Sequence, residues 1–141
     1  MKTLLAFIYN HFEFLYLDPR YRFTDSRTSG AATIDATLRL SGPLTSYWLS
    51  NDRGQIFCDV APTKFDSSKS WFRIPIVRQH LDGLDETKPI AAAETAAWVR
   101  DNLSRIEALF TDEAVAESCT ELSSLEKASA DKRFGPAQPP S

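Results

Sequence analysis

The feature that most constrains the fold is a hairpin pattern near the middle of the chain. Two runs rich in aromatic and β-branched residues, TSYWLS and QIFCDV, flank the polar segment Asn51-Asp52-Arg53-Gly54. Such runs predict strands, and a four-residue polar link that ends in glycine predicts a tight turn between them. The second run carries apolar residues on both faces, which indicates a central strand with one face under a helix.

Further strands are expected on both sides of this hairpin. Residues 32–40 alternate between apolar and polar with a period of two, which is typical of a half-buried strand, and Ser41-Gly42-Pro43 then turns the chain. Residues 21–26 and 71–76 predict two shorter strands, the second at a sheet edge because Pro75 cannot donate a ladder hydrogen bond. The whole pattern predicts an antiparallel β-meander of four to five strands.

Helices are expected at both ends of the chain. Residues 2–16 predict an amphipathic helix that stops before Asp18-Pro19, and residues 77–81 predict a helical turn. Residues 90–110 and 112–127 predict two C-terminal helices. The fold class is therefore predicted to be α+β, with an N-terminal helix, the meander, and C-terminal helices packed on one sheet face. Residues 1–127 would form a single domain. Residues 128–141, where the composition shifts to Ser, Ala, Lys, Gly, Pro and Gln, would form a disordered tail.

Composition excludes several classes of partner. The net charge of −3 and the pI of about 5.4 argue against general affinity for nucleic acid or for anionic membranes. The apolar start of the chain is interrupted by Asn10, His11 and Glu13, and no run approaches the ~18 apolar residues of a membrane span. We therefore expect a soluble, cytoplasmic protein, in which Cys58 and Cys119 are reduced thiols rather than a disulfide.

The sequence predicts neither catalysis nor a cofactor. Only two histidines, His11 and His80, are present, and no cysteine pair has the spacing of zinc ligands. Cys58 and His80 match no cysteine-enzyme signature, and a cysteine on the inward side of a strand is typical of packing. Gly-rich nucleotide-binding motifs are absent from the sequence.

The most distinctive charged feature is an acidic stretch near the C-terminus. Six acids and no base occur between Glu107 and Glu126. Among them, Glu113, Glu117 and Glu121 are spaced four apart, so they form one stripe on a helix. The stripe is interpreted either as a solvated face or as an electrostatic surface for a basic partner.

Aromatic residues of the meander allow a similar pair of interpretations. Tyr47, Trp48, Trp71 and Phe72 fall on neighbouring predicted strands, where they would be core residues or, on an open sheet face, interface anchors. The residues that we predict to bind a partner are Tyr47, Trp48, Asp52, Arg53, Asp112, Glu113, Glu117 and Glu121.

The order of elements resembles that of small bacterial immunity proteins of polymorphic-toxin and contact-dependent inhibition systems. The resemblance is carried by FTDSRTSGAATIDATLRLSG, NDRGQIFCDVAP and SWFRIPIVRQHLDG, within residues 21–110. It implies a protein without catalysis or cofactor that binds a cognate toxin domain and occludes its active site. No functional residue is carried over from the family.

Two other functional classes remain open. A secretion chaperone would bind an extended segment of an effector, usually as a homodimer, whereas an immunity protein, as a monomer, should form a tight one-to-one complex with its toxin. A small enzyme or ligand-binding protein would have a pocket with convergent polar groups and a titratable residue of shifted pKa.

Overall fold

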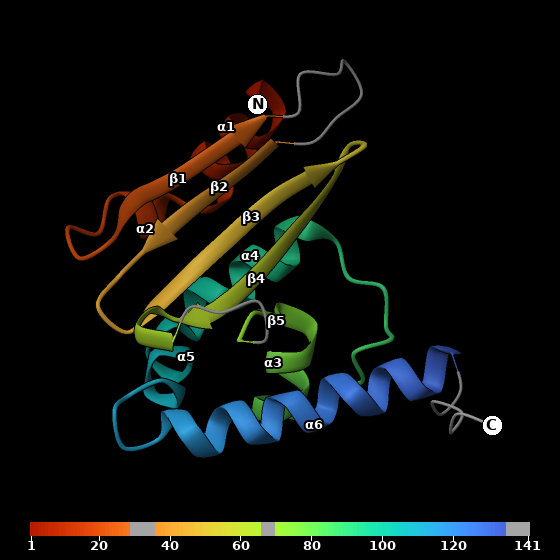
Figure 1. Cartoon of the computed structure of the whole chain (residues 1–141). Coiled ribbons are helices and arrows are strands. Elements are labelled where there is room, and N and C mark those ends of the chain that lie inside the picture. Colours follow the sequence, from red (N-terminus) through yellow and green to blue (C-terminus); the bar gives the residue numbers. More distant parts are fainter. Residues whose placement is uncertain (29–35, 66–69, 135–141) are drawn as a thin grey trace.

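The protein is built on one antiparallel sheet whose five strands lie in sequence order (Figure 1). The structure is a computed structural model, and it describes residues 1–28, 36–65 and 70–134. The predicted α+β class and the predicted meander are confirmed. Part of the predicted strand 32–40 lies outside the described residues. The strands are β1 (Arg22–Thr28), β2 (Ala36–Ser41), β3 (Thr45–Asp52), β4 (Gln55–Pro62) and β5 (Phe72–Arg73).

The turn between β3 and β4 is shorter than the predicted four residues. Only Arg53 and Gly54 lie between the strands, and both have positive φ, 54° and 90°. This is a type I′ turn, whose twist matches that of the strands it joins. The Asn51 side chain accepts a hydrogen bond from the Gly54 N–H at 2.9 Å. The polar residues on either side of the turn therefore belong to the ladder, with Asp52 paired to Gln55.

The N-terminal helix is broken once, although the sequence predicts one helix over residues 2–16. α1 (Lys2–His11) and α2 (Glu13–Tyr16) are separated by Phe12, which has φ −116° and ψ 25°. The Phe12 side chain is almost completely buried in the core. Burial of this aromatic ring favours the break, because its packing outweighs the small helical propensity of one position.

The predicted helix 90–110 is also divided, into α4 (Ala92–Asp101) and α5 (Leu103–Leu109). Asn102 lies at the break with φ −122° and ψ 18°. Its side-chain amide donates to the Trp98 carbonyl at 2.8 Å, so it satisfies a carbonyl at the end of α4.

The predicted edge strand over residues 71–76 is mostly wrong. Only Phe72 and Arg73 pair with β4, and α3 (Ile74–Asp82) begins at the next residue. Pro75 lies in the first turn of α3, where the missing N–H is not needed by the helix. Proline is compatible both with an edge strand and with the first turn of a helix, and in this protein the helix forms. Gly83 ends α3 in the left-handed conformation that suits glycine.

The last helix is longer than predicted. α6 (Val115–Phe134) continues past residue 127, so the prediction of a disordered tail is wrong for residues 128–134. Ser129 explains the extension, because it is 4% exposed and packs against the rest of the domain. Its hydroxyl donates to Glu86 at 2.6 Å and accepts from Arg73 at 3.2 Å. Residues 135–141 lie outside the described residues.

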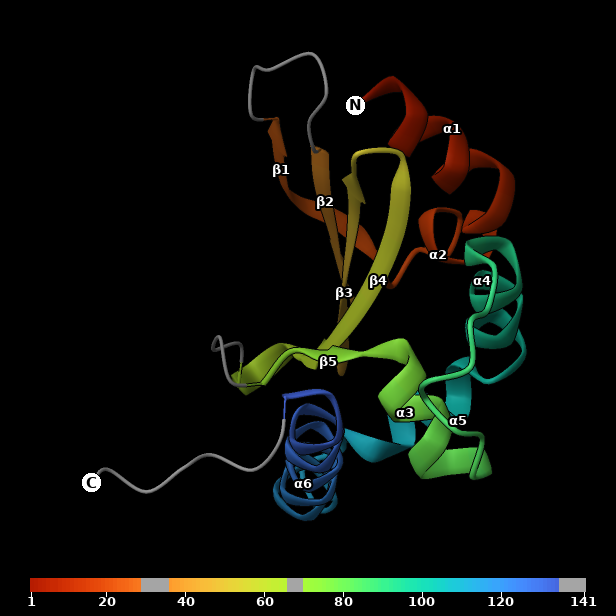
Figure 2. The same cartoon turned by 90° about the vertical axis from the view of Figure 1, so that its right-hand side faces the viewer.

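The core lies on one side of the sheet. Figure 2 shows α1, α2 and α4 on that side, and α6 across the end of the sheet next to β5. Within the described part of the chain, no helix covers the opposite side of strands β1–β4, which we call the open face (Figures 1 and 2). The largest fully buried side chains are Tyr47, Phe12, Phe72, Leu4, Leu15, Leu40, Leu49, Ile74, Ile76, Ile106, Leu122 and Val60.

A polar cluster joins the start of β1 to α5. The Tyr21 hydroxyl donates to Glu107 at 3.0 Å and lies 2.6 Å from the Thr45 hydroxyl, and burial raises the pKa of Tyr21. Arg20 forms two hydrogen bonds to the same carboxylate, at 3.0 and 3.1 Å. The Tyr21 ring also lies over Gly42, where a Cβ atom would be 2.5 Å from it, so this glycine is required for the close approach.

Candidate functional site

Three side chains form a cluster on the open face of the sheet. Trp48 on β3 points to this face because its neighbours Tyr47 and Leu49 are buried in the core. The Trp48 and Trp71 rings meet edge to face, with centroids 5.4 Å apart. Arg39, on β2, places its guanidinium 5.2 Å from the centroid of the Trp71 ring. We call these residues the Arg39–Trp48–Trp71 cluster.

Phe57 extends the aromatic surface on the same face. It lies on β4 opposite Ser50, two residues before Asp59, which is opposite Trp48. The Phe57 side chain is 46% exposed and Trp48 is 36% exposed. Large apolar groups are therefore presented to solvent on two adjacent strands, as in the centre of many protein interfaces.

The prediction that Tyr47 binds a partner is wrong. Its side chain is 0% exposed and lies in the core against Tyr21, with ring centroids 6.0 Å apart. The physical reason is the period of two along a strand, which sends Tyr47 and Trp48 to opposite faces. Of the two interpretations offered for the aromatic residues, the core position therefore holds for Tyr47 and Phe72, whereas Trp48 is exposed on the open face.

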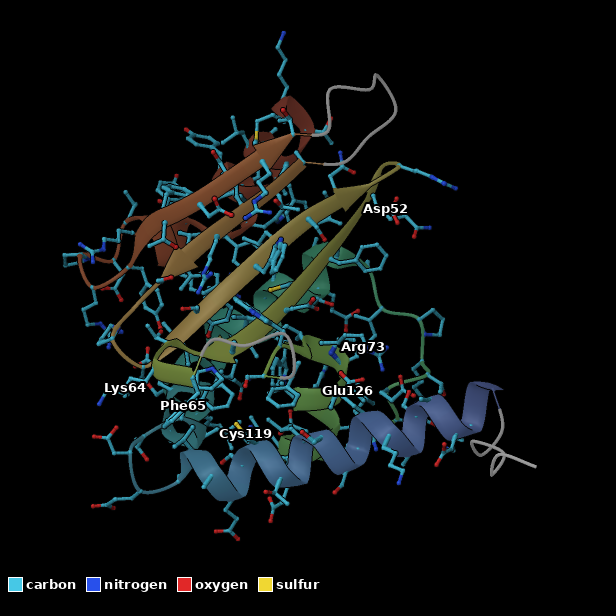
Figure 3. All side chains as sticks on the ribbon, viewed as in Figure 1. Asp52, Lys64, Phe65, Arg73, Cys119 and Glu126 are labelled. Atoms are coloured by element: carbon cyan, nitrogen blue, oxygen red, sulfur yellow. The ribbon has the colours of Figure 1, made fainter. Side chains whose placement is uncertain are left out.

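The hairpin tip lies apart from the other predicted binding residues. Arg53 is 87% exposed, and its Nε is 3.9 Å from an Asp52 carboxylate oxygen. Figure 3 shows Asp52 at one end of the sheet, whereas Arg73 and Glu126 lie near the other end, where α6 crosses. Hence the hairpin tip and α6 form two separate surfaces.

The predicted acidic stripe lies on the exposed side of α6 and just before it. Glu113, Glu117 and Glu121 are all exposed. Glu121 is 3.4 Å from His80 of α3, whereas the side of α6 with Ala116 and Cys119 borders Phe65, which follows β4. The stripe is therefore not continuous with the open face of the sheet. Its role in binding remains a prediction.

Asp112, the remaining acid of the predicted site, has a partner within the protein. Its carboxylate is 2.8 Å from the Lys64 ammonium group, and both side chains are well exposed. An exposed pair of this kind contributes little to stability. It does neutralise part of the acidic surface at the start of α6.

An ionic network that the sequence did not reveal fixes α6 to the edge of the sheet. Arg73 Nη2 lies 3.2 Å from Glu126 and 3.5 Å from Glu86, and Figure 3 shows Arg73 and Glu126 near each other. Ser129 bridges Arg73 and Glu86. The four residues come from β5, the loop after α3, and α6, so no local pattern could have indicated them.

Asp59 is the second feature that the sequence analysis missed. It lies half-buried on the open face, directly opposite Trp48. Burial, and secondarily the Glu126 carboxylate, raises the pKa of Asp59 to about 6, although Arg73 opposes the shift. A charged residue between the buried Cys58 and Val60 was the available signal, because strand interiors rarely hold an acid without a reason.

The residues considered for catalysis do not come together. Cys58 is buried in β4, and burial raises the pKa of its thiol well above the usual value. His80 contacts Glu121 on α6 instead. Within residues 1–28, 36–65 and 70–134, no group of His, Cys, Asp or Glu side chains is arranged to hold a metal ion.

Comparison of the chain with protein-family models, with curated proteins and with solved structures found no match. In the part of the chain that the structure describes, none of the helices combines the length and the apolar character needed to cross a membrane.

Proposed function

We propose that this protein binds a partner protein through the open face of its sheet and neutralises it by covering its active site, as an immunity protein does to a toxin. The observation that carries the proposal is the Arg39–Trp48–Trp71 cluster, which lies on a sheet surface that none of the helices in the described part of the chain covers. Tryptophan and arginine are the residues most enriched among those that dominate binding energy in protein interfaces.

The geometry of the cluster favours tight binding. Trp71 contacts both Trp48 and the Arg39 guanidinium, so the three side chains hold each other in place before a partner arrives. Less side-chain entropy is then lost on binding. The strands that carry Arg39 and Trp48, β2 and β3, pack against the core on their other face, so they form a rigid platform for the cluster.

The acidic stripe has a different role in this proposal. Because Glu113, Glu117 and Glu121 lie on α6 or just before it, and not on the open face of the sheet, they act at a distance rather than by contact. Exposed charges influence a partner over roughly 8–10 Å at physiological salt, which is enough to increase the association rate with a basic protein. Toxins that bind anionic substrates such as nucleic acids are basic partners of this kind.

The proposal expects a large secreted protein with a variable C-terminal domain to be encoded immediately upstream, and the test uses that C-terminal domain. Trp48→Ala is expected to weaken the complex by about 30-fold or more, the effect of losing a residue worth at least about 2 kcal/mol. Tyr9→Ala is the matched control, because Tyr9 is an exposed aromatic residue on α1, away from the open face. Calorimetry of the purified complex and growth of cells that express the toxin domain provide the two measurements.

Exchange of the three stripe acids for lysine tests the electrostatic part separately. Stopped-flow mixing should show slower association with less salt dependence, while dissociation stays the same. Equal affinity of the native and Trp48→Ala proteins would contradict the proposal. So would the absence of a large secreted protein with a variable C-terminal domain among the neighbouring genes.

A chaperone that binds an extended segment of its partner is the second candidate function. One observation favours it: no strand pairs with residues 55–58 of β4 on the side away from β3, within the described residues. Such a chaperone would bind an effector encoded nearby and would usually be a homodimer in solution.

A further inference from the structure

Among the described residues, no strand pairs with residues 55–58 of β4 on the side away from β3. β5 pairs only with Asp59 and Val60, and α3 then leads the chain away. Because Asp52 and Gln55 flank a two-residue turn, they exchange hydrogen bonds, and alternate pairs along the ladder do the same. The residues between those pairs point their backbone groups away from β3. The N–H and C=O of Ile56 and the N–H of Cys58 therefore face outward at this edge.

A groove runs along this edge. Two cavities of about 200 and 590 Å³ adjoin each other there and share several lining residues, so they form one continuous groove. Its walls come from β4, from α1, and from the start of α4 with the residues just before it. The shared lining is predominantly apolar and consists of Phe7, Ile56, Phe57, Ile90 and Ala92. Apolar side chains of a ligand can be buried in it.

A carboxylate without a hydrogen-bond donor lines the same groove. Asp59 accepts no hydrogen bond and forms no ion pair with any residue that the structure describes, although it is half-buried. Arg73, the nearest base, is bound to Glu126 and Glu86. The charge that would complement this end of the groove is therefore positive, and a buried acid gains most from a cation that brings its own hydrogen-bond donors.

We propose that the β4 edge binds a short extended segment of a partner protein as an added strand, with a lysine or arginine side chain at Asp59. Neighbouring residues of an added strand point to opposite faces of the sheet. The basic side chain would lie on the face of Asp59, and the apolar residues before and after it would enter the groove between α1 and α4. Backbone pairing supplies affinity and these alternating contacts supply specificity.

This site adjoins the Arg39–Trp48–Trp71 cluster, because Asp59 lies opposite Trp48, but it uses none of the three residues of the cluster. It rests on the proposed function only in that the ligand is a segment of a protein. Its test therefore uses no toxin. A phage-displayed library of random 12-residue peptides is selected on the full-length protein. The expected product is a family of peptides in which one Lys or Arg is flanked on each side by Val, Ile, Leu or Phe.

Affinity of the best selected peptide is then measured for two matched variants. Asp59→Asn should weaken binding by about tenfold or more, as expected for the loss of a hydrogen bond between charged groups. Asp52→Asn should change it less than about twofold, because Asp52 is an exposed acid of the same hairpin outside the groove. Replacing the basic residue of the peptide by norleucine should weaken binding to the native protein but not to the Asp59→Asn variant.

Amide hydrogen exchange read by NMR identifies strand addition itself. In the free protein the amides of Phe57 and Asp59 point toward β3 and should be protected, whereas those of Ile56 and Cys58 should exchange faster. The peptide should slow exchange at Ile56 and Cys58. The proposal is overturned if no basic-apolar family is selected, if Asp59→Asn binds the peptide as well as the native protein does, or if protection appears only elsewhere. Binding of a toxin domain at Trp48 would not be affected by any of these results.

Discussion

Substitution of Asp59 by asparagine should stabilise the protein, and the gain should depend on pH. The folded protein holds the pKa of Asp59 at about 6, chiefly because the side chain is buried, compared with 3.8 for the ordinary value. Between these two values the folded state binds a proton that the unfolded state has lost. The contribution of this residue to stability therefore falls as the pH rises through that window, and it is constant above it.

The magnitude follows from the same shift. A tenfold change in an acid dissociation constant is worth about 1.4 kcal/mol, so the rise from 3.8 to about 6 corresponds to at most about 3 kcal/mol at pH 7. Partial exposure of Asp59 reduces this value, and we expect a gain of about 1–3 kcal/mol for Asp59→Asn at pH 7. The gain should be much smaller at pH 4, close to the ordinary value of 3.8, and should disappear below about pH 3, where both states hold the proton.

Urea unfolding of the native and variant proteins at several pH values between 4 and 7.5 measures this gain directly. Asp85→Asn is a control of opposite sign. Hydrogen bonds from the Thr87 N–H and hydroxyl lower the pKa of Asp85, so this variant should lose stability at pH 7 and lose less as the pH falls toward 3. A stability difference for Asp59→Asn that is the same at pH 4 and pH 7 would refute the electrostatic explanation.

Three further predictions concern packing, charge and thiol chemistry. Gly42→Ala should lower stability by about 1–3 kcal/mol in thermal and urea unfolding, because its methyl group would overlap the Tyr21 ring; a neutral result would contradict the close approach. Glu107→Gln should cost about 1–2 kcal/mol in urea unfolding, since it weakens the hydrogen bonds that Tyr21 and Arg20 donate to this carboxylate; unchanged stability would contradict this role. In the folded protein, a disulfide reagent such as Ellman's should modify Cys119 and spare Cys58 until urea unfolds the chain, because Cys58 is fully buried; equal rates would contradict this.

Elements defined by local periodicity were predictable. The alternation in β2, β3 and β4 identified the sheet, and the glycine of the turn identified the hairpin, because each depends on residues that are neighbours in the chain. The burial of Ala36, Leu38 and Leu40 matches the predicted inward face of the second strand. Boundaries were predicted less well, because burial of Phe12 and of Ser129 comes from partners distant in sequence.

The candidate site was predictable only in part. Trp48 was recognised because a large aromatic residue on a strand has two possible environments. Its exposure depends on the arrangement of the helices, none of which covers that face in the described residues. Arg73 and Asp59 were missed, because their surroundings come from α6, more than fifty residues later in the chain. Long-range electrostatic contacts of this kind leave no pattern in local sequence.

The sequence order of the strands also has a consequence for how the chain folds. Each ladder from β1 to β4 joins neighbours along the chain, so only short loops must close to form the four-stranded part of the sheet. The helical layer is different, because α1 packs against α4, which lies some eighty residues later. The meander can therefore form early, whereas its apolar face stays uncovered until both ends of the chain have docked. Removal of either end should leave a sheet that aggregates rather than a smaller stable domain.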